Sequence, residues 1–429
     1  MIDLQPGTTE RVRPASDVAP VTTLGVSPSI APSGNDGSIG ALILGGAHGS
    51  LAVARSLGRR GIPVCFVASE PLITRFSRYV RANWSWRGVS DPQALEWLLD
   101  LAHRHCLKGW VLFPGGDSEA EFISQNHAPL SALFRVTTLP WEAGRWAFDK
   151  RLTYERAASL GIDFPRSYSV LDRRELAGLD CQFPLVLKPA TRDLKNDFTR
   201  DKAWRVDDRQ SLIERYDEAA RLVGKNAVVL QEMIPGSGAA QFSYAGVADR
   251  GTPVAALTAC RTRQFPVEFG YTSTLVQTVD NPAVEESARA FLRSLDYSGM
   301  FEVEFKFDAR DGRYKILDVN ARTWTWCALG PPAGADFAYV MWCLAIGEEV
   351  TPVRGRSGIS WMHASRDIVS ACTEMWLGRI SPGEYLKSLR GPMVFAAFAK
   401  DDPLPGVLDL PLVAFRQGVR RIRSFWRDN

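Results

Sequence analysis

The feature that most constrains the fold is a strand-like apolar run that leads into a glycine-rich turn. Residues 41–44 are all apolar, and residues 45–50 contain three glycines. Residues 51–60 then have the pattern of a helix, and residues 63–67 form a second apolar run. A strand, a glycine turn, a helix and a further strand make up one unit of a parallel sheet.

The same alternation continues along the chain. Residues 91–105 are predicted to be helical, and residues 110–113 form a buried strand that ends in a Pro-Gly-Gly-Asp turn. We therefore predict a small doubly wound α/β domain over residues 39–140. The first glycine turn has neither the G-x-G-x-x-G nor the G-x-x-x-x-G-K-[ST] spacing. It lies where open α/β sheets often bind ligands, and the sequence leaves open whether it contacts one.

Residues 141–345 have a different pattern, which indicates a mixed, largely antiparallel α+β domain. Helices are predicted at residues 149–160 and 285–295. Strands are predicted at residues 183–189, 228–236, 241–247, 254–260, 274–279, 300–307 and 315–319. The last two strands flank Asp311 and Gly312, a dipeptide typical of hairpin turns, so they are expected to pair.

Composition restricts the class of protein. A chain of 429 residues with 45% hydrophobic residues is expected to form two to three domains. The formal net charge of +3 and the absence of a central basic stripe argue against nucleic-acid binding. Seven scattered cysteines without a C-x-x-C pair indicate reduced thiols in the cytoplasm. The five histidines show no metal-ligand spacing.

The two ends of the chain carry little functional signal. Residues 1–38 are rich in Pro, Ser, Thr and Gly and lack the continuous apolar segment of a signal peptide, so we expect a disordered tail rather than a secretory signal. No apolar run has the length of a membrane span. Residues 346–429 are predicted to be a helical extension. Its last helix, residues 415–427, is basic and amphipathic, which favours a surface helix over one lying on an anionic membrane.

The predicted hairpin carries a set of oxygen-bearing side chains. Glu302 and Glu304 alternate with apolar residues, so both face the same side of their strand. Asp318 and Asn320 share a face of the partner strand, and Arg322 follows with the same parity. Carboxylate and amide oxygens are ligands that Mg²⁺ prefers. The alternative is a solvated sheet face with incidental acids, which the combination of residues disfavours.

Three lysines are candidates for binding phosphates. Lys188 ends an apolar strand, where an unpaired ammonium group would be costly to bury. Lys150 opens a helix directly after Asp149, and Lys202 follows the irregular segment 190–200. Surface lysines are abundant, so each of these residues taken alone is weak evidence.

A hinge-like segment, residues 231–236, follows the strand that contains Gln231. Adenine is recognised well by an extended backbone with one donor and one acceptor beside apolar side chains. The backbone groups of Glu232 and Ile234, on either side of Met233, are suited to that role. The alternative is a strand that simply ends in a turn.

Taken in order, these motifs resemble the ATP-grasp superfamily over residues 40–345. The motifs are Asp149-Lys150, residues 184–189, residues 231–236, Glu304, and Asp318-x-Asn320-x-Arg322. Within the superfamily, residues 74–80 and 261–266 are most similar to the carboxylate–amine ligase group that includes the D-aspartate ligases. The resemblance implies a pre-ATP-grasp α/β domain at residues 39–140, a two-lobed ATP-grasp domain at residues 141–345, and a C-terminal extension.

The resemblance also implies roles for individual residues. Lysines bind the ATP phosphates, the hinge binds adenine, acids and an amide hold two Mg²⁺ ions, and arginines steady the acyl phosphate. The implied phosphate and nucleotide contacts are Lys150, Lys188, Lys202, Gln231, Glu232, Met233 and Ile234. The implied metal ligands are Glu304, Asp318 and Asn320, and the implied catalytic residues are Arg263 and Arg322. The expected reaction joins a small-molecule carboxylate to an amine with release of ADP and phosphate.

The sequence departs from the family pattern in three places. Residues 190–200 are charged and lack glycine, although relatives often have a glycine-rich loop over the phosphates. An acidic residue that often binds ribose is replaced by Gln241. Asp318 stands where Glu is common, which keeps the charge on a shorter side chain.

Two other functions use the same residues. A phosphotransferase would pass the phosphoryl group to an acceptor without forming an amide, and a nucleotide-binding module would perform no chemistry. The full set of acids and arginines argues against the second alternative. Residues 265–274 are predicted to form the substrate loop, with an ordinary hairpin loop as the alternative. The oligomeric state stays open, with a homodimer as one option.

Overall fold

A computed structural model describes residues 39–168, 173–189, 196–201, 203–267, 270 and 272–413. All of them belong to one contact-defined unit of the chain, residues 38–429. The predicted N-terminal tail, Lys202, the segment 190–195 and the basic C-terminal helix lie outside the described residues. Within the described part of the chain, every helix falls short of the length and hydropathy that a membrane span requires.

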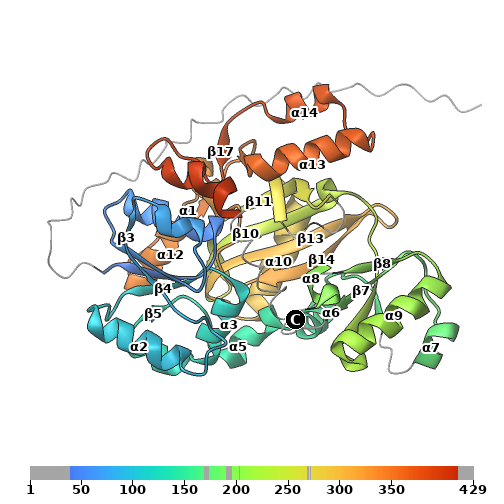
Figure 1. Ribbon diagram of the computed structural model, residues 1–429, viewed down its shortest axis with the longest axis horizontal. Helices are drawn as coiled ribbons and strands as arrows, with labels where there is room; N and C mark the ends of the chain where they lie inside the picture. Colours follow the sequence, from blue (N-terminus) through green and yellow to red (C-terminus); the bar gives the residue numbers. More distant parts are fainter. Residues whose placement is uncertain are drawn as a thin grey trace, which may run out of the picture. The chain divides into compact units, whose positions relative to one another are not determined.

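The first domain is built on a parallel sheet with the strand order β3-β2-β1-β4-β5 (Figure 1). Its strands are β1 (Ala41–Leu44), β2 (Val64–Ala68), β3 (Val80–Ser85), β4 (Val111–Pro114) and β5 (Arg135–Val136). Its helices are α1 (His48–Gly58), α2 (Ala94–Arg104), α3 (Asp117–Gln125) and α4 (His127–Ser131), with a 3₁₀ turn η1 (Ile73–Phe76). The predicted doubly wound α/β domain is confirmed. Because β1 pairs with both β2 and β4, the strand order reverses between β1 and β4, which opens a crevice at their carboxyl ends.

Glycine is needed where the loops after β1 and β4 touch. Gly46 has a φ of +74°, a conformation that residues with a Cβ rarely adopt. A Cβ on Gly46 would collide with the carbonyl oxygen of Gly115, and one on Gly115 would collide with that of Gly45. The glycine turn therefore lets two loops approach closely at the sheet edge, and it leads directly into α1.

A four-stranded antiparallel sheet with the order β6-β9-β7-β8 forms the next layer. Its strands are β6 (Ser167–Tyr168), β7 (Leu185–Pro189), β8 (Trp204–Val206) and β9 (Val228–Glu232). The helices α7 (Arg173–Gly178), α8 (Asp197–Asp201) and α9 (Arg209–Val223) belong to this part, and η2 (Lys225–Ala227) precedes β9. Figure 1 shows α9 alongside this sheet, where Leu212 packs into one cluster with Leu187 and Leu230.

The largest sheet has eight strands, in the order β14-β13-β10-β11-β12-β16-β17, and β15 pairs with β11 outside this order. Its strands are β10 (Gln241–Asp249), β11 (Thr252–Phe265), β12 (Thr272–Val279), β13 (Gly299–Asp308), β14 (Arg313–Asn320), β15 (Val353–Arg354), β16 (Ser360–Met362) and β17 (Met393–Phe395). The expected pairing of the last two predicted strands is confirmed by the antiparallel register of β13 and β14.

The remaining helices join the three sheets. They are α5 (Trp141–Phe148), α6 (Lys150–Ser159), α10 (Pro282–Ser294), α11 (Gly330–Ala333), α12 (Phe337–Ile346), α13 (Ala364–Trp376) and α14 (Pro382–Ser388), with 3₁₀ turns η3 (Gly238–Ala240) and η4 (Cys327–Leu329). The apolar helix α12 contacts α1, β10 and β11, so one hydrophobic core extends from the first sheet into the third. This shared core places the ends of β1 and β4 next to the segment that follows β14.

Candidate active site

The acids of β13 and the polar residues of β14 meet as one cluster. Glu302 lies opposite Asn320 in the antiparallel register, and Glu304 lies opposite Asp318. The Asn320 amide donates to Glu302 Oε2 at 3.0 Å and to Glu304 Oε1 at 3.3 Å. Two carboxylates therefore share one amide, and their oxygens face the same space. The expected oxygen-rich cluster is present.

Glu302 is the most buried member of this cluster. Its side chain accepts hydrogen bonds from Ser243 Oγ at 3.1 Å and from the Trp326 indole at 3.0 Å. Burial, reinforced by the charge of the neighbouring Glu304, raises the pKa of the Glu302 carboxyl to about 8. A cation bound beside the two glutamates would offset their repulsion and favour the ionised form.

Glu304 is held by side chains from two other strands. Gln241, the first residue of β10, donates to Glu304 Oε2 at 2.6 Å. Arg261 of β11 approaches Glu304 Oε1 at 3.5 Å. Gln241 therefore contacts a carboxylate of the cluster, and its proposed place beside the ribose stays a prediction.

Arg322 extends the cluster toward the first domain. Its guanidinium donates to Asn320 Oδ1 at 3.0 Å and to the two oxygens of Asp117 at 2.5 and 3.2 Å. Although burial lowers the pKa of Arg322, the charge of Asp117 raises it above its ordinary value, so the side chain stays cationic. Since Asp117 begins α3, this arginine connects β14 with the loop after β4.

Of the three candidate lysines, Lys150 and Lys188 lie in the described part of the chain and have different partners. Lys150 Nζ is 2.5 Å from Asp318 Oδ2, and both side chains are partly exposed. Lys188 Nζ donates to Gln231 Oε1 at 2.7 Å, and Gln231 in turn donates to Ser167 Oγ at 3.0 Å. Lys150 thus lies beside the acid cluster, whereas Lys188 belongs to the polar network of β7 and β9.

The hinge after β9 leaves a buried backbone donor available. The N–H of Glu232 bonds to Arg166 O at 2.9 Å, and that of Met233 bonds to Pro184 O at 3.2 Å. Among the described residues, the N–H of Ile234 has no hydrogen-bond partner although the residue is buried. The Glu232 carboxylate accepts from Lys315 Nζ at 3.0 Å, which ties the hinge to β14.

Arg263 does not join the acid cluster. It forms a buried ion pair with Asp367 of α13, with Nε–Oδ1 and Nη2–Oδ2 distances of 3.0 and 2.8 Å. The register of β11 against β12 shifts between Arg261 and Arg263. This bulge breaks the simple alternation, so the two arginines have different partners. Arg261 is the β11 arginine that the structure places beside Glu304.

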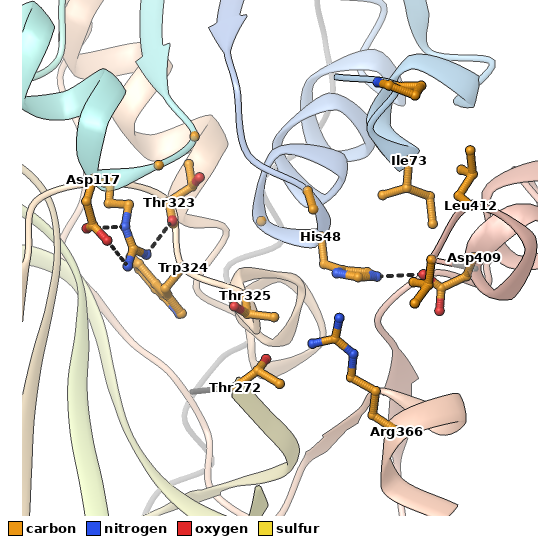
Figure 2. A pocket seen from close by; sticks show the side chains of 17 residues that line it. His48, Ile73, Asp117, Thr272, Thr323, Trp324, Thr325, Arg366, Asp409 and Leu412 are labelled. Carbon is orange, nitrogen blue, oxygen red and sulfur yellow. Dashed lines mark hydrogen bonds and ion pairs between the residues drawn. The ribbon is translucent and has the colours of Figure 1, made fainter. Parts of the chain in front are cut away.

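A cavity of about 320 Å³ opens next to Arg322. It is lined by residues 47–49 at the start of α1, residues 115–117 after β4, residues 322–325 after β14, and Thr272, Arg366 and Asp409. Figure 2 shows His48, Asp117 and Arg366 around this space. The glycine turn, whose role the sequence left open, therefore forms part of a cavity wall. Part of the predicted substrate loop also reaches it, through Thr272.

Sequence reasoning missed several parts of this arrangement. Glu302 was expected on the same strand face as Glu304, but its contacts with Ser243 and Trp326 were not predicted. The position of Arg261 beside Glu304 could not be predicted. Strict alternation places Arg261 and Arg263 on one face of β11 and gives no sign of the bulge. Arg366 and Asp409 reach the cavity from distant parts of the chain, and no local pattern indicates that.

Comparison with known proteins agrees with the fold. No family model matches the sequence. The chain is 25% identical over 299 residues to D-aspartate ligase of Enterococcus faecium, a match spanning 66% of this chain and 70% of that protein. The structure is similar to L-amino acid ligase from Bacillus licheniformis, with a TM-score of 0.54, 17% identity, and coverage of 74% of this chain and 79% of that one.

A second solved structure is the biotin carboxylase domain of Hydrogenobacter thermophilus 2-oxoglutarate carboxylase in complex with Mg-ADP, ADP and bicarbonate. It has a TM-score of 0.57 and 14% identity, and the match covers 76% of this chain and 74% of that one. The chain thus has the ATP-grasp fold, and it resembles the carboxylate–amine ligases of that superfamily, whose members form carbon–nitrogen bonds.

Proposed function

We propose that this chain is an ATP-dependent carboxylate–amine ligase that forms an amide through an acyl phosphate. The observation that carries the proposal is the position of Arg322. Its guanidinium contacts Asn320 in the acid cluster and also lines the cavity formed with the first domain. A phosphoryl group transferred from a nucleotide at the acid cluster would therefore reach a substrate in the cavity next to the Arg322 guanidinium.

ATP is proposed to bind between the second and third sheets, next to the acid cluster of β13 and β14. The free N–H of Ile234 suits a hydrogen bond to adenine, while the buried Ile234 side chain supports an apolar setting. Lys150, beside Asp318, and Lys188, beside Gln231, supply positive charge for phosphates. We retain Lys202 as a further phosphate contact, in line with the family resemblance.

The donor set fits magnesium. Glu304 and Asp318 offer carboxylate oxygens, and Glu302 adds a further carboxylate beside them. Asn320 turns its amide nitrogen toward the two glutamates and its oxygen toward Arg322, so its amide would have to rotate to offer an oxygen to the ion. Mg²⁺ prefers such ligands together with phosphate oxygens. When bound, the ion neutralises the charge of the phosphates and of the developing transition state. Two ions are proposed, because the residues form two neighbouring cross-strand pairs and offer more than one position.

The proposed reaction has two steps. A carboxylate oxygen of the first substrate attacks the γ-phosphorus of ATP, and the bond to the ADP oxygen breaks. The nitrogen of the amine then attacks the acyl carbon, loses a proton, and expels inorganic phosphate. Arg322 and Arg261, which lies beside Glu304, would stabilise the negative charge that develops in both steps. No covalent protein nucleophile is needed, because positioning and charge supply the catalysis.

The substrates are proposed to be a small carboxylic acid and an amine that share the cavity. Its volume of about 320 Å³ suits molecules of amino-acid size, and His48, Arg322 and Arg366 supply polar contacts on its wall. We further propose that the enzyme acts in the cytoplasm, where ATP is available and its free cysteines stay reduced.

The test is phosphate release from Mg-ATP across a panel of amino acids and small carboxylates, with mass spectrometry of the products. The proposal predicts ADP together with a product whose mass equals acid plus amine minus water. A phosphorylated acceptor without any condensation product would instead identify a phosphotransferase. Addition of hydroxylamine separates the two outcomes, since an acyl phosphate yields a hydroxamate and a phosphorylated hydroxyl does not.

A further inference from the structure

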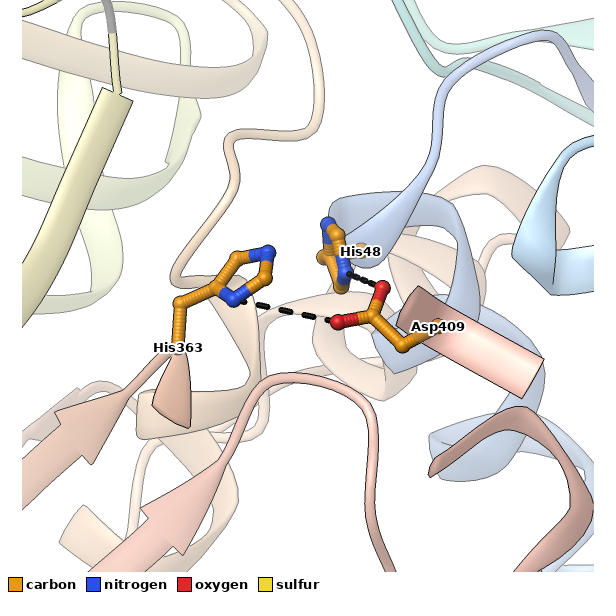
Figure 3. Close-up of side chains that lie close together, drawn as sticks. All are labelled: His48, His363 and Asp409. Carbon is orange, nitrogen blue, oxygen red and sulfur yellow. Dashed lines mark hydrogen bonds and ion pairs between the residues drawn. The ribbon is translucent and has the colours of Figure 1, made fainter. Parts of the chain in front are cut away.

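Two imidazoles and a carboxylate converge at the wall of the cavity, away from the acid cluster of β13 and β14. His48 begins α1, His363 lies between β16 and α13, and Asp409 lies in the helical segment 404–413. His48 Nε2 is 3.1 Å from Asp409 Oδ1, and His363 Nδ1 is 3.9 Å from Asp409 Oδ2. Figure 3 shows the three side chains turned toward one another.

These groups are buried without a permanent counter-charge. Asp409 is 7% exposed, and among the described residues its ion-pair partners are the two histidines alone. His363 is 1% exposed, and its Nε2 has no hydrogen-bond partner in the described part of the chain. A buried carboxylate without a permanent cation and a buried ring nitrogen without a hydrogen-bond partner both cost stability. A bound cation would satisfy both groups at once.

The spacing of the three groups suits a metal ion. One potential ligand atom from each residue lies within 4.8 Å of the others. Zinc binds histidine nitrogen and carboxylate oxygen at about 2 Å, which places tetrahedral ligand atoms about 3.3 Å apart. The pair formed by His48 and Asp409 already matches that separation. His363 completes the set through a ring nitrogen that lies within 4.8 Å of the other two ligand atoms.

We propose that His48, His363 and Asp409 bind a divalent transition-metal ion of the zinc class. The Ser365 hydroxyl lies 3.2 Å from His363 Nδ1 and 3.2 Å from Asp409 Oδ2, so it orients both ligands and leaves His363 Nε2 for the ion. Imidazole nitrogens favour this class of metal, whereas the oxygen-only cluster of β13 and β14 favours magnesium.

The proposed ion has two consequences for the protein. Three protein ligands leave a fourth coordination position. Because His48 and Asp409 line the cavity, that position opens toward the substrate space. The ion also ties the segment 404–413 to α1. This segment is anchored separately by Asp402, which accepts from Arg55 Nε at 2.9 Å and Ser77 Oγ at 2.7 Å, so losing one metal ligand is not expected to detach it.

The experiment is a titration of the full-length protein with Co²⁺ after treatment with a chelator. Co²⁺ replaces zinc in such sites and gives visible absorption bands. We expect saturation at one equivalent, displacement by Zn²⁺, and a melting temperature raised by Zn²⁺. His48→Ala, His363→Ala and Asp409→Asn should each weaken Co²⁺ binding by at least about 100-fold. His103→Ala, which alters an exposed histidine on α2, should leave binding unchanged.

A conservative variant guards against loss of folding. His48→Cys keeps a ligand at this position and should retain Co²⁺ with a new thiolate charge-transfer band. The proposal is overturned if the folded protein shows no Co²⁺ spectrum, or if the spectrum survives in both His48→Ala and His363→Ala. In that case the three residues form a hydrogen-bonded contact without an ion. The readout does not use ATP turnover, so it is independent of the ligase proposal.

Discussion

The acid cluster and the imidazole cluster of this protein are assembled in opposite ways. The four polar residues of β13 and β14 come from one hairpin, and their positions follow from strand register. The residues His48, His363 and Asp409 come from three segments that are far apart in the chain. One cluster is therefore specified by local alternation, and the other depends on how separate elements pack.

This difference explains what each cluster can do. A hairpin presents several carboxylates on one face at fixed spacing, which suits a hard cation and the phosphates it binds. Segments that converge from three elements enclose a small space with buried, softer ligands. Arg322 lies at the junction of the two regions, because it follows β14 and lines the cavity.

The largest effect is expected for the hairpin cluster. Glu304→Gln removes a carboxylate that faces Asn320 and Gln241, and it should lower ATP turnover by at least ~100-fold. Phosphate release in the presence of the identified substrates measures this effect. The matched control is Glu286→Gln, an exposed glutamate on α10, which should retain normal turnover. Full activity of Glu304→Gln would remove this residue from the site.

Substitutions of the two arginines of β11 are expected to have different effects, one on stability and the other on catalysis. Arg263→Gln leaves the buried Asp367 without its cation and should lower the free energy of unfolding by about 3–5 kcal/mol. Arg261→Gln should instead lower turnover by roughly 100-fold while the protein melts near the normal temperature. Denaturant unfolding and phosphate release distinguish the pair. The reverse pattern would mean that the bulge does not divide their roles.

A smaller effect is expected for the loop that forms the cavity wall. Gly46→Ala combines a positive φ with a collision against Gly115, and it should destabilise the protein by about 1–3 kcal/mol and raise the KM for the cavity substrate. Gly109→Ala provides the comparison, because its φ is also positive but nothing lies within 4 Å of the added Cβ. Equal behaviour of the two variants would show that the contact between the loops is unimportant.

Much of the fold was predictable because it rests on local signals. Strands β1, β2 and β4 and helices α1 and α2 followed from apolar runs and glycine turns, whereas β3 and β5 were not predicted. The pairing of β13 with β14 followed from alternation around Asp311 and Gly312. The fold class and the family resemblance were confirmed. These features depend on residues that are close in sequence.

The rest of the candidate site depends on tertiary packing. The bulge in β11 separates Arg261 from Arg263, and a residue count along the strand does not reveal it. His363 and Asp409 lie far from His48 in the sequence, so ligand spacing along the chain gave no sign of their cluster. Gln241 contacts Glu304 because β10 pairs with β13, which only the assembled sheet shows.

The most direct test of the proposed acyl phosphate follows an oxygen atom. The carboxylic acid identified in the substrate panel would be labelled with ¹⁸O in its carboxyl group and converted to the amide with Mg-ATP. Attack of the carboxylate on ATP predicts that one ¹⁸O atom appears in the inorganic phosphate for each amide formed. Amide formation with unlabelled phosphate would contradict the account, because the carboxyl oxygen would then not have been activated by phosphorylation.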